Sequence, residues 1–276
     1  AIVDPWNVPP SSSKRELARR ILDDERMDRV DRMGRALLAS GMSAGVHYKE
    51  VWVRDLNTFI IPLLEETPQE SVREALLTFF HFQGDDGNIV DGYVSKAAGS
   101  ERYKYRFSDT KPNLKAHKNT VETDQESSLV LAVCRYVKKT GDTAILDEVV
   151  RGAAVRERLG MALHYVYTHR WSSEHGLAWG ATTVDWGDVQ PEHEWGVELD
   201  ENSHRAIDIY DNALLLSALQ EYCNVVGSIE PWSNRVLELR TAIREGLWNS
   251  DAQRFTPHIY LEGSPFPESF DESAVY

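Results

Sequence analysis

A tryptophan, an arginine and a carboxylate stand close together in the segment GVHYKEVWVRDLNTFI at 45–60, where Trp52, Arg54 and Asp55 open an expected helix. A tryptophan face packs on the apolar side of a pyranose ring, and a neighbouring arginine and carboxylate give directional hydrogen bonds to adjacent hydroxyl groups. The segment therefore predicts sugar recognition. The structural alternative is that Asp55 complements the helix dipole and Arg54 forms a surface ion pair.

A second group of polar side chains lies in TVETDQESS at 120–128, directly before an apolar helix. A capping box between Thr123 and Glu126 explains part of this pattern in purely structural terms. The other acceptors are then free to face a pocket at the rim of the fold. We expect these substrate-binding candidates to be Glu122, Asp124 and Gln125.

The richest segment is WGATTVDWGDVQPEHEWGVELDENSH at 179–204, which interleaves three tryptophans with many carboxylates. An acid between indole rings is partly desolvated, which raises its pKa and keeps a proton available near neutral pH. Hydrolysis of a glycosidic bond requires such a proton donor and a second carboxylate. Asp188 and Asp185 are the candidate donors, and Trp186 is a candidate stacking residue.

The alternatives for this segment are a metal-binding loop and a loop that is merely acidic. The regular Asp-x-Asp-x-Asp-Gly spacing of a calcium loop is missing, and no His-x-x-x-His pair accompanies His193 or His204. The sequence therefore predicts neither a metal site nor a cofactor, and it contains no glycine-rich phosphate loop.

Two further segments could complete the site. DIYDNALLL at 208–216 precedes an apolar helix; capping explains one or two of its polar residues, and Asp211 is expected to line the same pocket. Near the end of the chain, Glu268 and Glu272 are the candidates for the second catalytic carboxylate. The alternative for these two residues is an exposed acidic tail.

Charge and composition exclude several classes of partner. The chain has 30 Lys+Arg against 44 Asp+Glu, a net charge of −14, which argues against nucleic acid or an anionic membrane surface. Its apolar runs are too short to span a bilayer, and two cysteines cannot form a disulfide framework. No signal peptide is visible, which favours the cytoplasm, although a cleaved leader would also fit. The oligomeric state is left open.

Helical periodicity dominates the elements that must position these residues. Residues 1–13 contain three prolines and three serines and are expected to form an extended lead-in. Residues 14–276 are expected to form the catalytic domain. Its predicted helices are Arg15–Ala39, Leu56–Leu64, Ser71–Phe82, Asp124–Thr140, Ala144–Arg170, Ala206–Val226 and Ser233–Trp248.

A loose repeat indicates how the helices are arranged. The segments 79–93, 169–184 and 247–260 each run from an aromatic helix end through a polar turn into a short extended stretch. This pattern predicts an all-α fold of helical hairpins in a toroid, with short β-hairpins at one rim. The chain ends in a proline-rich loop at 262–276, so we expect either a frayed terminus or an incomplete ring whose parent polypeptide continues.

With these residues the chain resembles the six-hairpin, (α/α)6-toroid glycoside hydrolases, in particular glucoamylases and the glucosidase domain of glycogen debranching enzymes. VWVRDL at 51–56 is similar to their Trp-x-Arg-Asp motif, which implies that Arg54 and Asp55 hold the hydroxyl groups of the terminal sugar. Asp-Trp-Gly-Asp at 185–188 resembles the motif that carries the general acid of debranching enzymes and related sugar phosphorylases, which assigns that role to Asp188. The neighbouring Asp185 competes for it.

The resemblance also shows a departure. The families have six hairpins of two helices each and a catalytic base near the last helices, whereas this sequence predicts only seven or eight helices. The expected function is an inverting glycoside hydrolase that acts on an α-linked glucoside or a related oligosaccharide. The alternatives are a truncated toroid that binds carbohydrate without catalysis, and a sugar phosphorylase or epimerase on the same fold.

Overall fold

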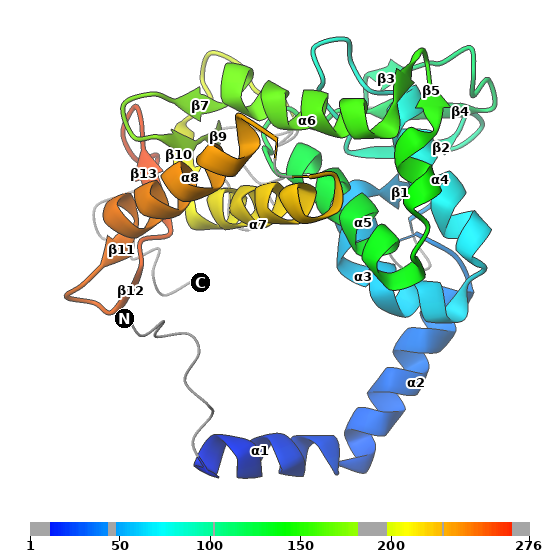
Figure 1. The fold of residues 1–276 in the computed structure, drawn as a ribbon, viewed down its shortest axis with the longest axis horizontal. Coiled ribbons are helices and arrows are strands. Elements are labelled where there is room, and N and C mark those ends of the chain that lie inside the picture. The colour runs from blue at the N-terminus through cyan, green and yellow to red at the C-terminus, as the bar shows by residue number, and fades with distance from the viewer. Residues whose placement is uncertain (1–11, 44–47, 102, 182–197, 228, 267–276) are drawn as a thin grey trace.

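The computed structural model describes residues 12–43, 48–101, 103–181, 198–227 and 229–266. This part of the chain is mainly helical (Figure 1), with short strands and one 3-10 turn at Thr143–Asp147. Its α-helices are α1 (Ser12–Leu22), α2 (Glu25–Ala39), α3 (Val53–Glu66), α4 (Gln69–His81), α5 (Gln125–Thr140), α6 (Val155–His169), α7 (Ile209–Val225) and α8 (Trp232–Gly246).

The helices pack as successive hairpins. Helix α5 lies between α3 and α7 and packs on both. Helices α4, α6 and α8 pack around these three helices (Figure 1). Helix α5 is buried along nearly its whole length, because its neighbours surround it. This arrangement confirms the prediction of an all-α fold of helical hairpins with few short strands. In the described residues the hairpins make up part of a ring.

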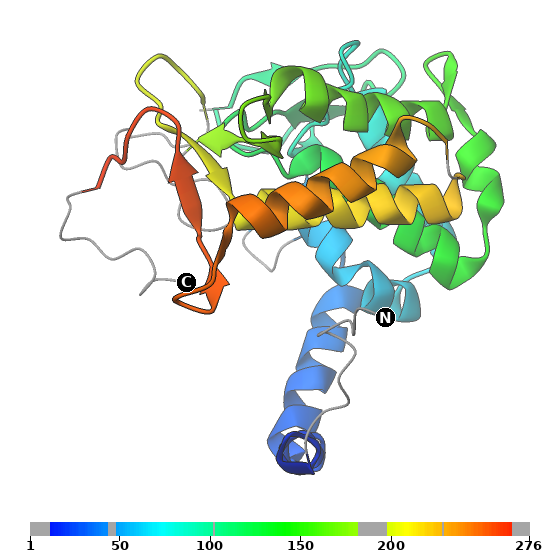
Figure 2. The same ribbon diagram turned by 60° about the vertical axis from the view of Figure 1, so that its left-hand side comes forward.

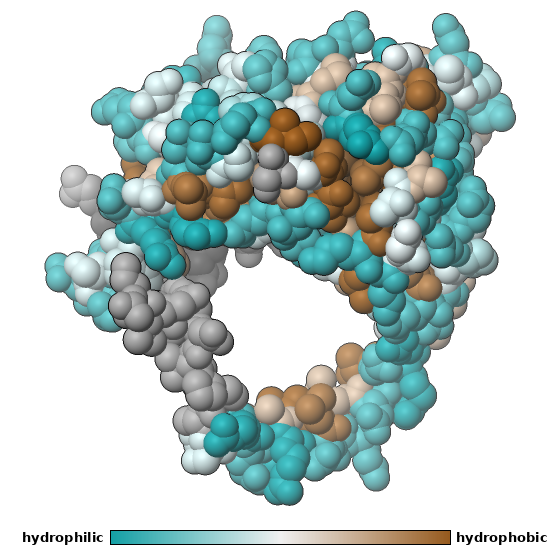
Figure 3. Space-filling model, viewed as in Figure 1, coloured by the Kyte–Doolittle hydropathy of each residue, from teal (hydrophilic) through white to brown (hydrophobic). Residues whose placement is uncertain are grey.

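Helices α1 and α2 project from this body (Figures 1 and 2) and contain no buried residue. Apolar side chains gather along the side of this arm that faces the open space beside the body (Figure 3). Only the end of the arm is anchored, since Leu38 and Met42 pack against the core. The exposed large side chains of the arm are Leu17, Ile21, Leu22, Met27, Val30, Met33 and Leu37.

Two-residue strands form hairpins between the helices, in agreement with the predicted repeat. Strand β7 (Trp171–Ser172) pairs with β8 (Leu177–Ala178), and β11 (Trp248–Asn249) pairs with β12 (Arg254–Phe255). These two hairpins fall in the second and third predicted segments. Gly176, with φ at 65°, adopts the left-handed conformation that the first of these turns requires.

Sheet structure is more extensive than the sequence predicted. An antiparallel sheet has the order β1 (Val51–Trp52), β2 (Gly92–Ser95), β4 (Leu114–His117) and β3 (Tyr105–Arg106). A second sheet has the order β13 (His258–Tyr260), β10 (Arg205–Asp208) and β9 (Gly180–Ala181). Strands of two to four residues are too short to show alternation, and their partners lie far apart in the chain.

Three helix predictions were wrong in extent. In one of them, Ala206–Val226, residues 206–208 belong to β10, and α7 begins only at Ile209. The predicted helix Arg15–Ala39 is two helices, because the chain breaks before Asp24, whose side chain accepts a hydrogen bond from the Arg26 amide and caps α2. Helix α1 begins at Ser12, so the last two residues of the predicted lead-in are helical. Residues 1–11 lie outside the described part.

The predicted helix Ala144–Arg170 is shortened at its start. A 3-10 turn and the hairpin of β5 (Val149–Val150) and β6 (Ala153–Ala154) precede α6. Arg151 and Gly152, with φ at 48° and 82°, form the turn of this hairpin. Positive φ is incompatible with a right-handed helix. The apolar periodicity continues across this turn, so the predicted helix began too early in the sequence.

Candidate sugar-binding site

Arg54 occupies the first turn of α3 and points into the protein. Its guanidinium lies 2.6 Å from the Glu122 carboxylate and donates to both oxygens of Asp124, at 2.5 Å from Nε and 3.0 Å from Nη2. The side chain is only 10% exposed, so the alternative of a surface ion pair was wrong. Buried, forked arginine–carboxylate contacts of this kind fix the orientation of all the groups involved.

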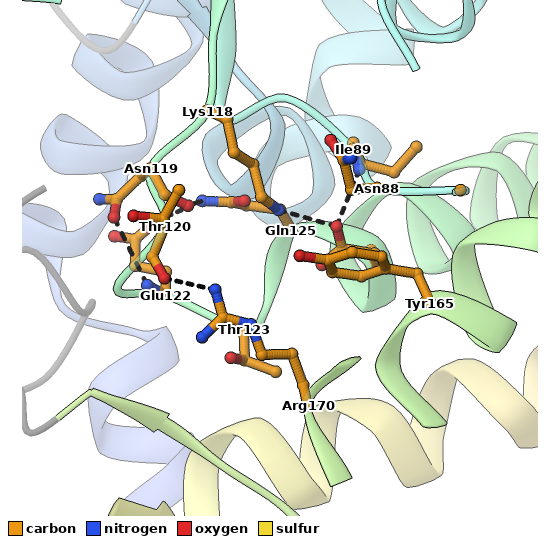
Figure 4. A network of polar contacts seen from close by, with 12 residues as sticks. Asn88, Ile89, Lys118, Asn119, Thr120, Glu122, Thr123, Gln125, Tyr165 and Arg170 are labelled. Carbon is orange, nitrogen blue, oxygen red and sulfur yellow. Dashed lines mark hydrogen bonds and ion pairs between the residues drawn. The ribbon is translucent and has the colours of Figure 1, made fainter. Parts of the chain in front are cut away.

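The segment before α5 is shaped by its own side chains (Figure 4). The Asn119 side-chain oxygen accepts hydrogen bonds from the amides of Val121 and Glu122. The side-chain amide of Gln125 donates 3.0 Å hydrogen bonds from Nε2 to the Glu122 carboxylate and to the main-chain carbonyl of Asn119. These contacts hold Glu122 in place against Arg54.

The predicted capping box does not form. Helix α5 begins after Asp124, and the Thr123 hydroxyl donates instead to the Trp179 carbonyl at 2.9 Å. The Glu126 side chain accepts hydrogen bonds of 2.8 Å from the Ile89 amide and from Lys118 (Figure 4). Glu126 is completely buried and joins α5 to the loop before β2, so its role is to tie together two segments that flank the site.

The start of α7 brings two more acids to the same place. The Asp208 carboxylate accepts a 2.6 Å hydrogen bond from the Asp211 amide, which confirms the capping interpretation for one residue of this segment. Asp211 is buried beside it, and its role in lining a pocket stays a prediction. Tyr210 donates a 3.1 Å hydrogen bond to Asp124, so α7 also contacts the partners of Arg54.

Burial and neighbouring carboxylates raise the proton affinity of these acids. Burial raises the pKa of Glu122 and of Asp211 well above the usual range, and neighbouring carboxylates add to the effect. Burial also raises the pKa of Asp55, against the opposing effect of Arg54. Burial alone would lower the pKa of Arg54, but Asp124 and Glu122 reverse this and raise it. Folding therefore favours the protonated form of the Glu122, Asp211 and Asp55 carboxyls.

Aromatic rings form one side of the site. Trp52 contacts the His117 ring edge-on, with 4.9 Å between the ring centroids. Tyr103 stacks on His117, with 4.0 Å between the ring centroids. Gly92 lies between Trp52 and His117 in the sheet, and a Cβ at Gly92 would be 3.1 Å from the Trp52 ring. A side chain at position 92 would therefore press on the Trp52 ring, and a glycine avoids this contact. Trp52 is half-buried, so part of its surface is accessible.

The structure brings together most of the predicted substrate-binding residues. Trp52, Arg54 and Asp55 come from β1 and α3, and the others come from the start of α5 and α7. Asp185, Trp186, Asp188, Glu268 and Glu272 lie outside the described residues, so their roles stay predictions. The predicted residues that meet at the site are Trp52, Arg54, Asp55, Glu122, Asp124, Gln125 and Asp211.

Sequence reasoning missed Asp91, Tyr103 and His117. They lie on or beside the four-stranded sheet, whose strands were not predicted. Tyr210 stood in a segment that was singled out, but its hydroxyl could not be connected to Asp124 across 86 positions of sequence. The aromatic spacing around Tyr103 was the only signal in the sequence, and it is weak.

Two further observations concern metal binding and membrane spans among the described residues. They contain no group of three or more His, Cys, Asp or Glu side chains arranged to hold a metal ion. Among the helices that the structure describes, none is long and apolar enough to cross a membrane.

The half-buried carboxyl of Asp208 leads to a prediction about the pH dependence of stability. Burial raises its pKa from 3.8 to about 6, so folding favours the protonated form. Its stabilising contribution is present below about pH 4 and is lost as pH rises towards 6. Asp208→Asn keeps a capping oxygen and removes the charge. We expect the variant to have a higher Tm than wild type at pH 7 and an equal Tm near pH 4, measured by thermal denaturation. An equal difference at both pH values would contradict this.

No protein-family model and no curated protein matches the sequence. Among solved structures, the fold is similar to a rhamnosidase from Klebsiella oxytoca with rhamnose bound, at 16% sequence identity and a TM-score of 0.48. The similarity covers 76% of this chain, which spans 36% of the length of that rhamnosidase.

Proposed function

We propose that the chain carries the sugar-binding site of an inverting glycoside hydrolase that acts on an α-linked glucoside or a related oligosaccharide. The observation that carries the proposal is the contact of Arg54 with Glu122 and Asp124 beside Trp52. It combines a fixed guanidinium, buried carboxyls and a partly accessible indole. Sugar-binding sites need these three elements: directional hydrogen bonds, an apolar face and proton-carrying groups.

The residues have distinct roles in this proposal. Arg54 and Asp55 hold hydroxyl groups of the sugar at the non-reducing end, and Trp52 stacks on its ring. Asp188 protonates the leaving oxygen, with Trp186 beside it. Inversion then requires a second carboxylate about 6.5–9.5 Å from the first, to leave room for the attacking water; Glu268 and Glu272 are its candidates.

Binding is tested independently of turnover. We expect glucose, maltose or a related α-linked disaccharide to shift the indole resonance of Trp52 in NMR spectra, assigned with Trp52→Phe. Arg54→Lys keeps the charge but loses the forked geometry, and it should weaken this binding roughly tenfold or more. Arg19→Lys changes an exposed arginine of α1 and is the matched control. Equal binding by wild type and Arg54→Lys would contradict the assignment of the site.

Addition of inorganic phosphate distinguishes the related enzyme class. A phosphorylase would release sugar phosphate only when phosphate is present, whereas a hydrolase would turn over without it. Sugar binding without release of product under either condition would support the non-catalytic alternative.

A further inference from the structure

Asp91 connects the two segments that carry the Arg54 contacts. Its carbonyl accepts a 2.8 Å hydrogen bond from the Val53 amide, at the start of α3. Its own amide donates a 2.8 Å hydrogen bond to the His117 carbonyl, at the end of β4. The main chain of Asp91 therefore fixes the distance between Arg54 on one side and the segment that leads to Glu122 on the other.

The Asp91 side chain lies among the charged groups of the site. It is 4% exposed, and its charge acts on Arg54, Asp55 and Glu122. One oxygen, Oδ1, has no hydrogen-bond partner in the described part of the chain. A buried carboxylate without a full set of hydrogen bonds is costly, so its retention at this position needs a reason beyond packing.

The His117 ring lies next to the Asp91 carboxylate. The distance from its Nε2 to the nearer Asp91 oxygen is 3.6 Å, and the side chain is 1% exposed. The stacked Tyr103 and the edge of Trp52 fix the ring, and neither ring nitrogen has a hydrogen-bond partner among the described residues. The neighbouring rings thus hold the imidazole, and its Nε2 lies near the Asp91 carboxylate.

We propose that Asp91 and His117 form a positioning pair, in which His117 orients the Asp91 carboxylate so that its charge acts on Arg54, Asp55 and Glu122. The charged groups that face Asp91 come from α3, from β4 and from the segment before α5. They are Arg54, Asp55, His117 and Glu122. The effect on sugar binding rests on the proposed function, whereas the effect on the carboxyls does not.

The first test measures proton affinity in the free protein. The Glu122 carboxyl is followed by 13C NMR over pH and is assigned by its loss in Glu122→Gln. Asp91→Asn removes the charge and keeps both main-chain hydrogen bonds, so the Glu122 titration midpoint should fall by about one pH unit, a tenfold loss of proton affinity. Asp91→Ser should give the same shift and serves if Asp91→Asn folds poorly. The exposed Asp109→Asn is the matched control.

A purely structural role for Asp91 would lower Tm and leave the Glu122 midpoint at its wild-type value. That result in both Asp91 variants would overturn the proposal, whether or not the protein binds sugar. Failure of the proposed function would show differently, as absence of sugar binding with the midpoint shift intact.

The second test asks whether the two residues act together. His117→Phe keeps an aromatic ring against Tyr103 and Trp52 but removes both nitrogens. If the residues form a pair, Asp91→Asn and His117→Phe should each weaken binding of maltose several-fold, and the double variant should bind no more weakly than the weaker single variant. Effects that multiply in the double variant would show that the residues act independently and would contradict the pair.

Discussion

Replacing Arg54 by alanine should produce the largest loss of stability of any single change at the site. The substitution leaves Glu122 and Asp124 buried without their positive partner, and breaking a buried ion pair in this way typically costs about 3–5 kcal/mol. The free energy of unfolding, measured in urea at pH 7, checks this value. The loss should be smaller at pH 4, because burial raises the pKa of Glu122 and favours its uncharged form as the pH falls.

A matched control separates burial from charge. Arg19 of α1 forms an ion pair with Glu16 in which both side chains are more than half exposed, so Arg19→Ala should change stability by less than about 1 kcal/mol. A similarly small effect of Arg54→Ala would show that the Arg54 contacts contribute little to the fold and would contradict their central position.

Asp188→Asn should cause the largest loss of activity while sugar binding stays near the wild-type level. If Asp188 is the proton donor, its removal takes away general acid catalysis, which contributes about a hundredfold to ten-thousandfold to the rate. The residues proposed to hold the sugar, Arg54 and Asp55, are unchanged in this variant. Hydrolysis rates for an α-linked disaccharide, with binding measured by NMR on the same sample, separate the two effects.

Asp185→Asn is the matched variant for this experiment, since Asp185 is the competing candidate. Loss of turnover in Asp185→Asn with an active Asp188→Asn would exchange their roles. Full activity in both variants would exclude this segment as the source of the proton.

Local patterns predicted the parts of the fold that depend on neighbouring residues. Helical periodicity located α5 and α8 to within one or two residues, because apolar spacing and capping act over a few turns. The same rule overran the turn at Arg151 and Gly152, where two residues with positive φ interrupt a continuous apolar pattern. The four-stranded sheet escaped prediction, since it pairs strands from residues 51 to 117.

The site shows the same division. Residue chemistry identified Arg54, Glu122 and Asp124 separately, but only the fold shows that they contact one another across 70 positions of sequence. The capping box was a wrong prediction because the Glu126 carboxylate accepts hydrogen bonds from Lys118 and from the Ile89 amide instead. Both partners lie outside the first turn of α5, where a capping box has its partner. Long-range partners therefore account for what could not be predicted from the sequence.

Analysis of the anomeric configuration of the product tests the central claim most directly. The chain is incubated with a panel of α- and β-linked disaccharides and aryl glycosides, and released sugar is followed by proton NMR. We expect release from an α-linked substrate with inverted configuration, and loss of this release in Asp188→Asn. Release with retained configuration would contradict the inverting mechanism. No release from any substrate, together with no sugar-dependent shift of the Trp52 resonance, would contradict the glycoside hydrolase proposal altogether.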